Sequence, residues 1–261
     1  MKLFISTDIE GICTVTHWDE CHLEHPKFSA EQMSREVAAA CRAALDFGVE
    51  EVVVKDSHAT GRNLVADMLP RGVKLIRGWS GGPPMMMEGL KEDFSAAAYI
   101  GYHSSAGSNG NPLAHTISSA KVRALYPNDV LTSEFYLNHH FALHLGVPSI
   151  FLSGDKALCE EAQDQVPGLV TFAVKEGLGD ATINLHPEDA IEGIYQGMKK
   201  ALEDPAPLMK REEKIEARLD FIHHRTAYKA SFFPGVRQVS PTEVRFEGNG
   251  YEIMRTLMFV L

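Results

Sequence analysis

The chain opens on MKLFISTDIEG, residues 1–11, in which an apolar run is followed by two acids and a glycine. The apolar residues 3–5 predict a β-strand at the start of the chain. Asp8 and Glu10 follow at its end, and side chains two residues apart on an extended chain point the same way. The two carboxylates can therefore converge on one metal ion, or they can face water or cap a following helix.

Segments that predict strands and helices alternate after this opening strand. A helical period runs from Ser29 to Phe47, with Gly48 where a helix end is expected. Residues 51–55, Glu-Val-Val-Val-Lys, then predict a buried parallel strand. Further strands are expected at 73–76, 96–101, 149–153 and 170–174, and helices at 62–69, 132–145 and 156–165. The alternation predicts an α/β fold with a mainly parallel sheet flanked by helices.

The last third of the chain has a different pattern. Its expected elements are a helix at 187–203, strands at 217–222 and 242–246, and an apolar helix after Gly250. We expect a smaller α+β C-terminal lobe over residues 176–261, beside an α/β domain over residues 1–175. No change of composition marks the boundary between them.

Composition excludes several classes of protein. The 261 residues include 35 acids and 25 bases, for a formal net charge of −10, so nucleic acid is not an expected partner. No segment approaches the roughly 20 apolar residues of a membrane span, so no membrane association is expected. The four cysteines lack the CxxC spacing, which favours free thiols and a cytoplasmic location.

Residues that can bind a metal recur at the ends of the predicted strands. Asp8 and Glu10 end the first strand, His58 follows the second, and His103 follows the strand at 96–101. Functional residues of an open parallel sheet collect at the carboxyl ends of its strands. Glu134 adds a carboxylate from the following helix, and this mixture of nitrogen and oxygen donors suits Zn²⁺, Mn²⁺ or Co²⁺. Five donors exceed one tetrahedral site and suggest two ions bridged by one acid.

Other residues admit two interpretations. A lone histidine is more often structural than a ligand, and a helical glutamate such as Glu134 usually faces water. Asp56 can orient His58 or cap the next helix, Asn138 can support the site or lie on the surface, and Lys175 can place a charge near the site or be solvated. The adjacent pairs His139-His140 and His223-His224 diverge in direction, so we interpret them as structural or surface residues.

Several of these motifs occur together in an order that resembles a known family. The motifs are Ser6-Thr7-Asp8-Ile9-Glu10-Gly11, Asp56-Ser57-His58, Gly101-Tyr102-His103, His115-Thr116, Glu134 with Asn138, Ser153-Gly154-Asp155 and Ala173-Val174-Lys175. In this order they resemble the zinc-dependent D-aminopeptidases that are encoded with dipeptide transporters. The C-terminal third resembles that family only in its pattern of elements, and the stretch from Trp18 to His25 departs from it.

The resemblance implies a zinc metallopeptidase that removes N-terminal D-amino acids from short peptides. It implies two Zn²⁺ ions per subunit, with Asp8 bridging them and Glu10, His58, His103 and Glu134 completing the ligand set. It also implies that His115 is the catalytic residue and that the protein is a homodecamer. A histidine at this position could donate a proton to the leaving amine or stabilise the tetrahedral oxyanion.

Two other functions remain open from the sequence. A dinuclear metallohydrolase could act on another small amide or on a phosphoester, although no glycine-rich phosphate-binding loop accompanies the donors. A noncatalytic peptide-binding protein could hold the metals structurally, but such sites are usually closed and rich in cysteine.

Overall fold

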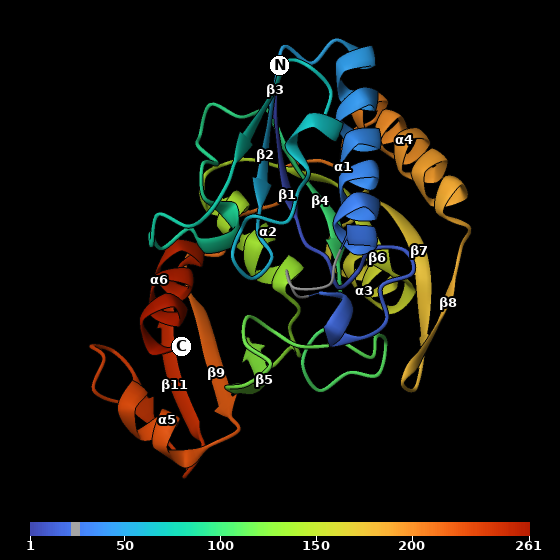
Figure 1. Cartoon of the computed structure of the whole chain (residues 1–261). Helices are drawn as coiled ribbons and strands as arrows, with labels where there is room; N and C mark the ends of the chain where they lie inside the picture. The colour runs from blue at the N-terminus through green and yellow to red at the C-terminus, as the bar shows by residue number, and fades with distance from the viewer. Residues whose placement is uncertain (22–26) are drawn as a thin grey trace.

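The structure is a computed structural model that describes residues 1–21 and 27–261, and its centre is a seven-stranded sheet (Figure 1). The strand order is β3-β2-β1-β4-β6-β7-β8, and every neighbouring pair is parallel except β7 and β8. The strands are β1 (Lys2–Thr7), β2 (Glu51–Asp56), β3 (Val73–Ile76), β4 (Ala96–Tyr102), β6 (Ser149–Asp155), β7 (Val170–Leu178) and β8 (Ala181–Asn184).

Helices cover both faces of this sheet, as parallel strands require. Leu3 and Ile5 of β1 belong to a core shared with helices α1 (Lys27–Phe47) and α4 (Pro187–Glu203), which pack against each other (Figure 1). Phe4 points to the other core, shared with α2 (Glu134–His144) and α6 (Gly250–Val260). A further helix, α3 (Lys156–Gln165), packs on β6 and β7. Successive side chains of β1 point to opposite faces of the sheet and therefore pack into two separate cores.

A second, antiparallel sheet has the order β10-β11-β9-β5. Its strands are β5 (Val122–Pro127), β9 (Ile215–Phe221), β10 (Arg237–Gln238) and β11 (Glu243–Gly248), and helix α5 (His224–Ala230) packs against them. β5 comes from the first half of the chain, and β7 passes without interruption through residue 175. The division of the chain into units 1–175 and 176–261 stays a prediction.

The predicted fold class is confirmed, whereas β5, β8, α5 and β10 were not predicted. β8 has four residues that are all at least partly exposed, and β10 has two, so neither carries an apolar run. Among the described residues, three 3₁₀ turns connect the larger elements: η1 (Trp18–Glu20), η2 (Ala66–Met68) and η3 (Met85–Met87). The helix expected at 62–69 was wrong, because only the short turn η2 forms there. Within the described ranges, none of the helices combines the length and the apolar character that a membrane span needs.

The order of the strands places the segments that follow β1, β2 and β4 at one edge of the sheet, beyond the carboxyl ends of these strands. The chain runs outward from β1 through β2 to β3, then returns to add β4 on the other side of β1, so the order reverses between β1 and β4. Ligands bind at such reversal points, beyond the carboxyl ends of the strands. The loop after β1 crosses the end of β4 closely: Gly11 N–H donates to the carbonyl of Gly101 at 2.8 Å, and a Cβ on Gly11 would lie 1.8 Å from Tyr102 O. Only glycine fits there.

Candidate metal centre

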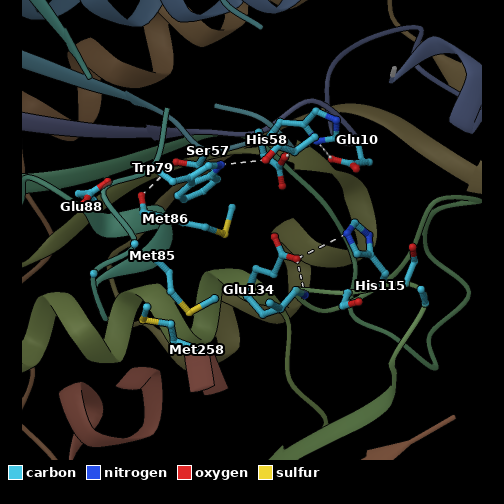
Figure 2. A pocket seen from close by; sticks show the side chains of 18 of the residues that line it. Glu10, Ser57, His58, Trp79, Met85, Met86, Glu88, His115, Glu134 and Met258 are labelled. Atoms are coloured by element: carbon cyan, nitrogen blue, oxygen red, sulfur yellow. Dashed lines mark hydrogen bonds and ion pairs between the residues drawn. The ribbon is translucent and has the colours of Figure 1, made fainter. Parts of the chain in front are cut away.

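Six side chains from five segments meet at this edge of the sheet. Asp8 and Glu10 follow β1, His58 follows β2, and His103 follows β4. Glu134 is the first residue of α2, whose N-cap Ser133 accepts a hydrogen bond from Tyr136 N–H. The sixth is His115, from the loop between β4 and β5. All except the fully buried His103 line a cavity of about 530 Å³ (Figure 2).

Histidines and carboxylates alternate across the site, and Asp8 lies at its centre. His58 Nδ1 is 3.3 Å from Asp8 Oδ1 and 3.0 Å from Glu10 Oε2. On the other side of Asp8, His103 Nε2 is 3.5 Å from Asp8 Oδ2 and 3.6 Å from Glu134 Oε2. Asp8 thus presents one oxygen to each histidine, so it is the acid that would be shared if two ions were bound.

The backbone fixes which nitrogen of each histidine faces the site. His58 Nε2 lies 3.0 Å from the carbonyl of Cys21, His103 Nδ1 lies 2.9 Å from that of Ser104, and His115 Nδ1 lies 2.9 Å from that of Leu113. A carbonyl oxygen can only accept, so each outer nitrogen carries a proton and donates it. The inner nitrogen of each ring is left facing the carboxylates, as in histidines that bind metals.

Two buried atoms of the cluster lack hydrogen-bond partners among the described residues: Glu10 Oε2 and His103 Nε2. Glu10 Oε2 lies 3.0 Å from His58 Nδ1 but outside hydrogen-bonding geometry. A buried polar atom without a partner is costly, and a bound cation would satisfy both atoms. One donor atom each from Asp8, Glu10 and His103 lie within 4.8 Å of one another, as do those of His103, His115 and Glu134. These donors fit zinc.

The electrostatics of the cluster also suit a cation. Burial, reinforced by Glu10, raises the pKa of Asp8 to about 6. Burial acts in the same direction on Glu134, but the neighbouring His103 and His115 outweigh it and lower the pKa of Glu134 to about 2. Burial would lower the pKa of His58 and His103, yet the surrounding carboxylates raise it well above the ordinary value in both. A metal would therefore displace protons from this cluster when it binds.

His115 occupies the side of the cluster that faces the cavity. Its ring stacks on His103 with centroids 4.3 Å apart, and its Nε2 lies 3.7 Å from Glu134 Oε1. The ring of Trp18 meets it edge-on at 5.2 Å. The imidazole is therefore oriented from three directions, by Leu113 O, His103 and Trp18.

Neighbouring groups hold the loop that carries Asp8 and Glu10. Lys175 Nζ, from β7, donates to the carbonyls of Glu10 and Val15, and Asn111 Nδ2 donates to Glu10 O at 3.0 Å. Glu134 is fixed separately, because its Oε1 accepts from Ile117 N–H at 2.6 Å. The sequence indicated Lys175 as one candidate for this region, and it gave no signal for Asn111 or for the amide of Ile117.

The structure brings together all six residues predicted for the site. It adds Trp18 and the carbonyl of Cys21, both from the stretch that departs from the resembled family, whereas His22 and His25 lie outside the described residues. Asp56 accepts hydrogen bonds from Asn63 and from Leu64 N–H, and no hydrogen bond joins it to the ring of His58 among the described residues. Asn138 is buried behind the cavity, where it donates to Tyr102 Oη at 2.9 Å.

Comparisons with known proteins agree with this site. The model of the D-aminopeptidase family matches residues 1–259. A D-aminopeptidase from Bacillus subtilis (strain 168) is 29% identical over 256 residues, covering 95% of this chain and 91% of that protein. A solved structure, a Zn-dependent D-aminopeptidase DppA from Bacillus subtilis described as a self-compartmentalizing protease, has a TM-score of 0.93 and 26% identity over 100% of this chain and 96% of its own. This chain belongs to the D-aminopeptidase family.

Proposed function

We propose that the protein is a zinc-dependent aminopeptidase that releases N-terminal D-amino acids from short peptides. The observation that carries this proposal is the position of Asp8. Its two carboxylate oxygens face His58 and His103, and the inner nitrogen of each ring is turned toward the carboxylates. Membership of the D-aminopeptidase family supplies the stereochemistry of the substrate. The similar solved structure is of a Zn-dependent enzyme, which supports zinc as the metal.

The donors divide into two sets that share Asp8, which supports two Zn²⁺ ions per subunit. Glu10 and His58 would complete one set, and His103 and Glu134 the other. When bound, the ions would supply an acidified water and a Lewis acid for the scissile carbonyl.

His115 has a different role in this proposal. Its Nδ1–H is engaged by Leu113 O, so Nε2 is the atom that holds or gives a proton in the cavity. From there it can protonate the leaving amine or donate a hydrogen bond to the tetrahedral oxyanion. Trp18 and His103 keep the ring in place and restrict water on two of its sides. His115 also lies near enough to Glu134 to belong to its donor set, so the assignment needs a variant that separates metal content from turnover.

We propose further that the protein is a cytoplasmic homo-oligomer, with the decamer as the expected size. The support is the description of the similar structure as self-compartmentalizing, together with the four cysteines, which are all free and buried. Light scattering coupled to size-exclusion chromatography measures the size directly, and a monomer at micromolar concentration would contradict this part of the proposal.

The decisive experiment measures release of free amino acid from D-Ala-D-Ala and L-Ala-L-Ala by the same preparation. The protein is assayed after reconstitution with Zn²⁺, after chelation, and after zinc is restored. We expect cleavage of the D-peptide alone, its loss on chelation and its return with zinc. The variant Asp67→Asn changes an exposed acid of η2 that lies outside the site and serves as a matched control.

Three outcomes would contradict the proposal in different ways. Equal cleavage of the L-peptide would remove the stereochemical assignment. Cleavage that survives chelation would remove the metal. Cleavage of neither peptide by zinc-loaded protein would favour another small amide, a phosphoester or a noncatalytic role.

A further inference from the structure

The cavity has a second wall, opposite the metal donors, that carries almost no charge. It is formed by Trp79, the methionines Met85, Met86 and Met258, and the carboxylate Glu88. Figure 2 shows these methionine and tryptophan side chains on one side of the cavity and His115 on the other, with Glu134 between them. The proposed chemistry uses none of these residues.

Trp79 is the fixed part of this wall. Its Nε1–H donates to Ala59 O at 2.8 Å, and Lys55 Nζ lies 3.9 Å from the centre of its ring. Lys55 is itself fully buried and donates to the carbonyls of Asp56 and Gly78, both at 2.7 Å. Trp79 is nevertheless 41% exposed, so an apolar surface is held rigidly at the edge of a cavity.

Met85 is held in a conformation that a side chain resists. Its φ is +50°, in the left-handed region that favours glycine, and it follows the Gly81-Gly82-Pro83-Pro84 loop. Such a conformation is unfavourable for a non-glycine residue, and strained residues cluster at functional sites. Glycine would relieve the strain here, yet the chain carries a side chain that lines the cavity.

Met86 and Met258 complete the wall from two distant parts of the chain. Met86 Sδ lies 3.4 Å from Asn138 Nδ2, which orients the side chain. Met258 comes from α6, the last helix, and is only partly buried. Methionine is flexible and polarizable, so a cluster of three can adapt to apolar groups of different shape.

We infer that this wall, the Met-Trp wall, is a specificity pocket that selects a large apolar side chain on the N-terminal residue of the peptide. The inference rests on the proposed function, in which that residue is released one at a time and needs a bounded cavity beside the metals. Trp79 supplies a rigid surface for the side chain, and the methionines supply an adjustable one. Glu88 does not compete for it, because its Oε2 accepts from Ser80 N–H at 3.1 Å.

The test compares kcat/KM for D-Leu-D-Ala, D-Ala-D-Ala, D-Lys-D-Ala and D-Ala-D-Leu with zinc-loaded protein. Replacing alanine by leucine at the N-terminus should raise kcat/KM about tenfold or more, because one methylene in an apolar pocket is already worth about tenfold. The same replacement at the second position should change it less than about threefold.

Two variants assign the preference to the wall. Met258→Ala and Met85→Gly should each lower the ratio of kcat/KM for D-Leu-D-Ala over D-Ala-D-Ala about threefold to tenfold, with zinc content unchanged. Met85→Gly also removes the left-handed strain, so its melting temperature should not fall, which separates selectivity from folding. Arg255→Ala changes an exposed residue of α6 that does not line the cavity, and it should leave the ratio unchanged.

A binding measurement tests the pocket without depending on peptide cleavage. The chain has two tryptophans, Trp18 and Trp79, and both line the cavity, so intrinsic fluorescence reports its occupancy. D-leucine should change the fluorescence at about tenfold lower concentration than D-alanine. This signal tests the pocket even if none of the peptides is cleaved, so failure of the proposed function and failure of this inference are distinguishable.

Three results would overturn the inference. The first is cleavage of D-Ala-D-Ala with no preference for leucine at the N-terminus. The second is a preference for D-Lys-D-Ala, which would assign the wall to Glu88, or for D-Ala-D-Leu, which would assign it to the following residue. The third is a preference for leucine that Met258→Ala and Met85→Gly both leave unchanged.

Discussion

The two walls of the cavity are built in opposite ways. The candidate metal donors follow strands of the parallel sheet or, in Glu134, begin helix α2, and the side chains of His58, His103 and Glu134 are tied to backbone groups. The Met-Trp wall draws on a 3₁₀ turn, a loop and the last helix, and three of its four apolar side chains are methionines. One wall is rigid and charged, and the other is mainly adaptable and apolar.

This difference suits the two walls to different proposed roles, catalysis for the wall of metal donors and choice of substrate for the Met-Trp wall. Electrostatic stabilisation requires donors whose positions do not change as charge develops, and the sheet supplies such positions. A side-chain pocket gains from apolar area and tolerates adjustment, so loops and a remote helix suffice for it. Substitutions in the first wall should therefore remove turnover, whereas those in the second should shift preference among substrates.

The largest effect is expected from Asp8→Ala, which removes the acid shared by both donor sets. Zinc content should fall from the proposed two ions per subunit to less than one, and kcat/KM should fall by more than about 10³-fold. Elemental analysis of the purified variant, with circular dichroism to verify folding, checks both. Retention of two ions would remove Asp8 from the centre of the site.

His115→Gln tests the part of the first wall that is assigned to proton transfer. We expect kcat to fall about 10²-fold to 10³-fold with zinc content unchanged, because a proton donor is lost and the ligand set is kept. Elemental analysis beside steady-state kinetics separates the two effects. If zinc is lost together with activity, His115 is a ligand in the donor set of Glu134.

Acidification should weaken zinc binding through the first wall alone. The surrounding carboxylates raise the pKa of His58 and of His103 well above the ordinary value in the metal-free protein, so zinc must displace more tightly held protons than from free imidazoles. Affinity for zinc should therefore fall as the pH falls, by about tenfold per pH unit for each histidine that is protonated in the metal-free protein, and more steeply below about pH 6, where Asp8 is also protonated.

Competition with a chelator of known affinity at pH 6, 7 and 8 measures this dependence. Calorimetry in two buffers of different ionisation enthalpy counts the released protons. A zinc affinity that is constant over this range would show that the histidines are already neutral and that the carboxylates do not raise their pKa.

The smallest effect is expected from Trp79→Phe in the second wall. The variant keeps an aromatic face toward Lys55 but loses the hydrogen bond to Ala59 O. KM for D-Leu-D-Ala should rise less than about tenfold and kcat should stay within about twofold, because the contact is made equally in the ground and transition states. A fall in kcat with unchanged KM would extend the catalytic wall to Trp79.

Much of the fold was predictable because its elements carry local signals. β3 and α3 have the bounds expected from the sequence, and α4 begins at Pro187 as expected. β5 was missed because the neighbours that bury it belong to β9, about 90 residues later in the chain. Pairing between strands so far apart in the sequence depends more on tertiary contacts than on local propensity.

The candidate site was predictable to the extent that it depends on strand ends. Asp8, His58 and His103 follow buried strands, so the parallel arrangement alone brings them together. The carbonyl of Cys21 and the amide of Ile117 could not be predicted, because backbone groups are present at almost every residue and carry no signal in the sequence. Met258 was also missed, because nothing local in the sequence indicates that it lines the same cavity as Glu134, the last of the proposed metal ligands, 124 residues earlier.

The sequence by itself determined the class of fold, the family and the set of candidate metal donors. Hydrophobic periodicity defines the strands and helices, and chemically distinctive residues at the strand ends define the donors. Tertiary structure alone decided which nitrogen of each histidine faces the carboxylates, that Asp8 lies between two donor sets, and that α6 supplies part of the opposite wall. These features depend on distances between segments remote in the chain, and only the packing of the sheet and its helices sets those distances.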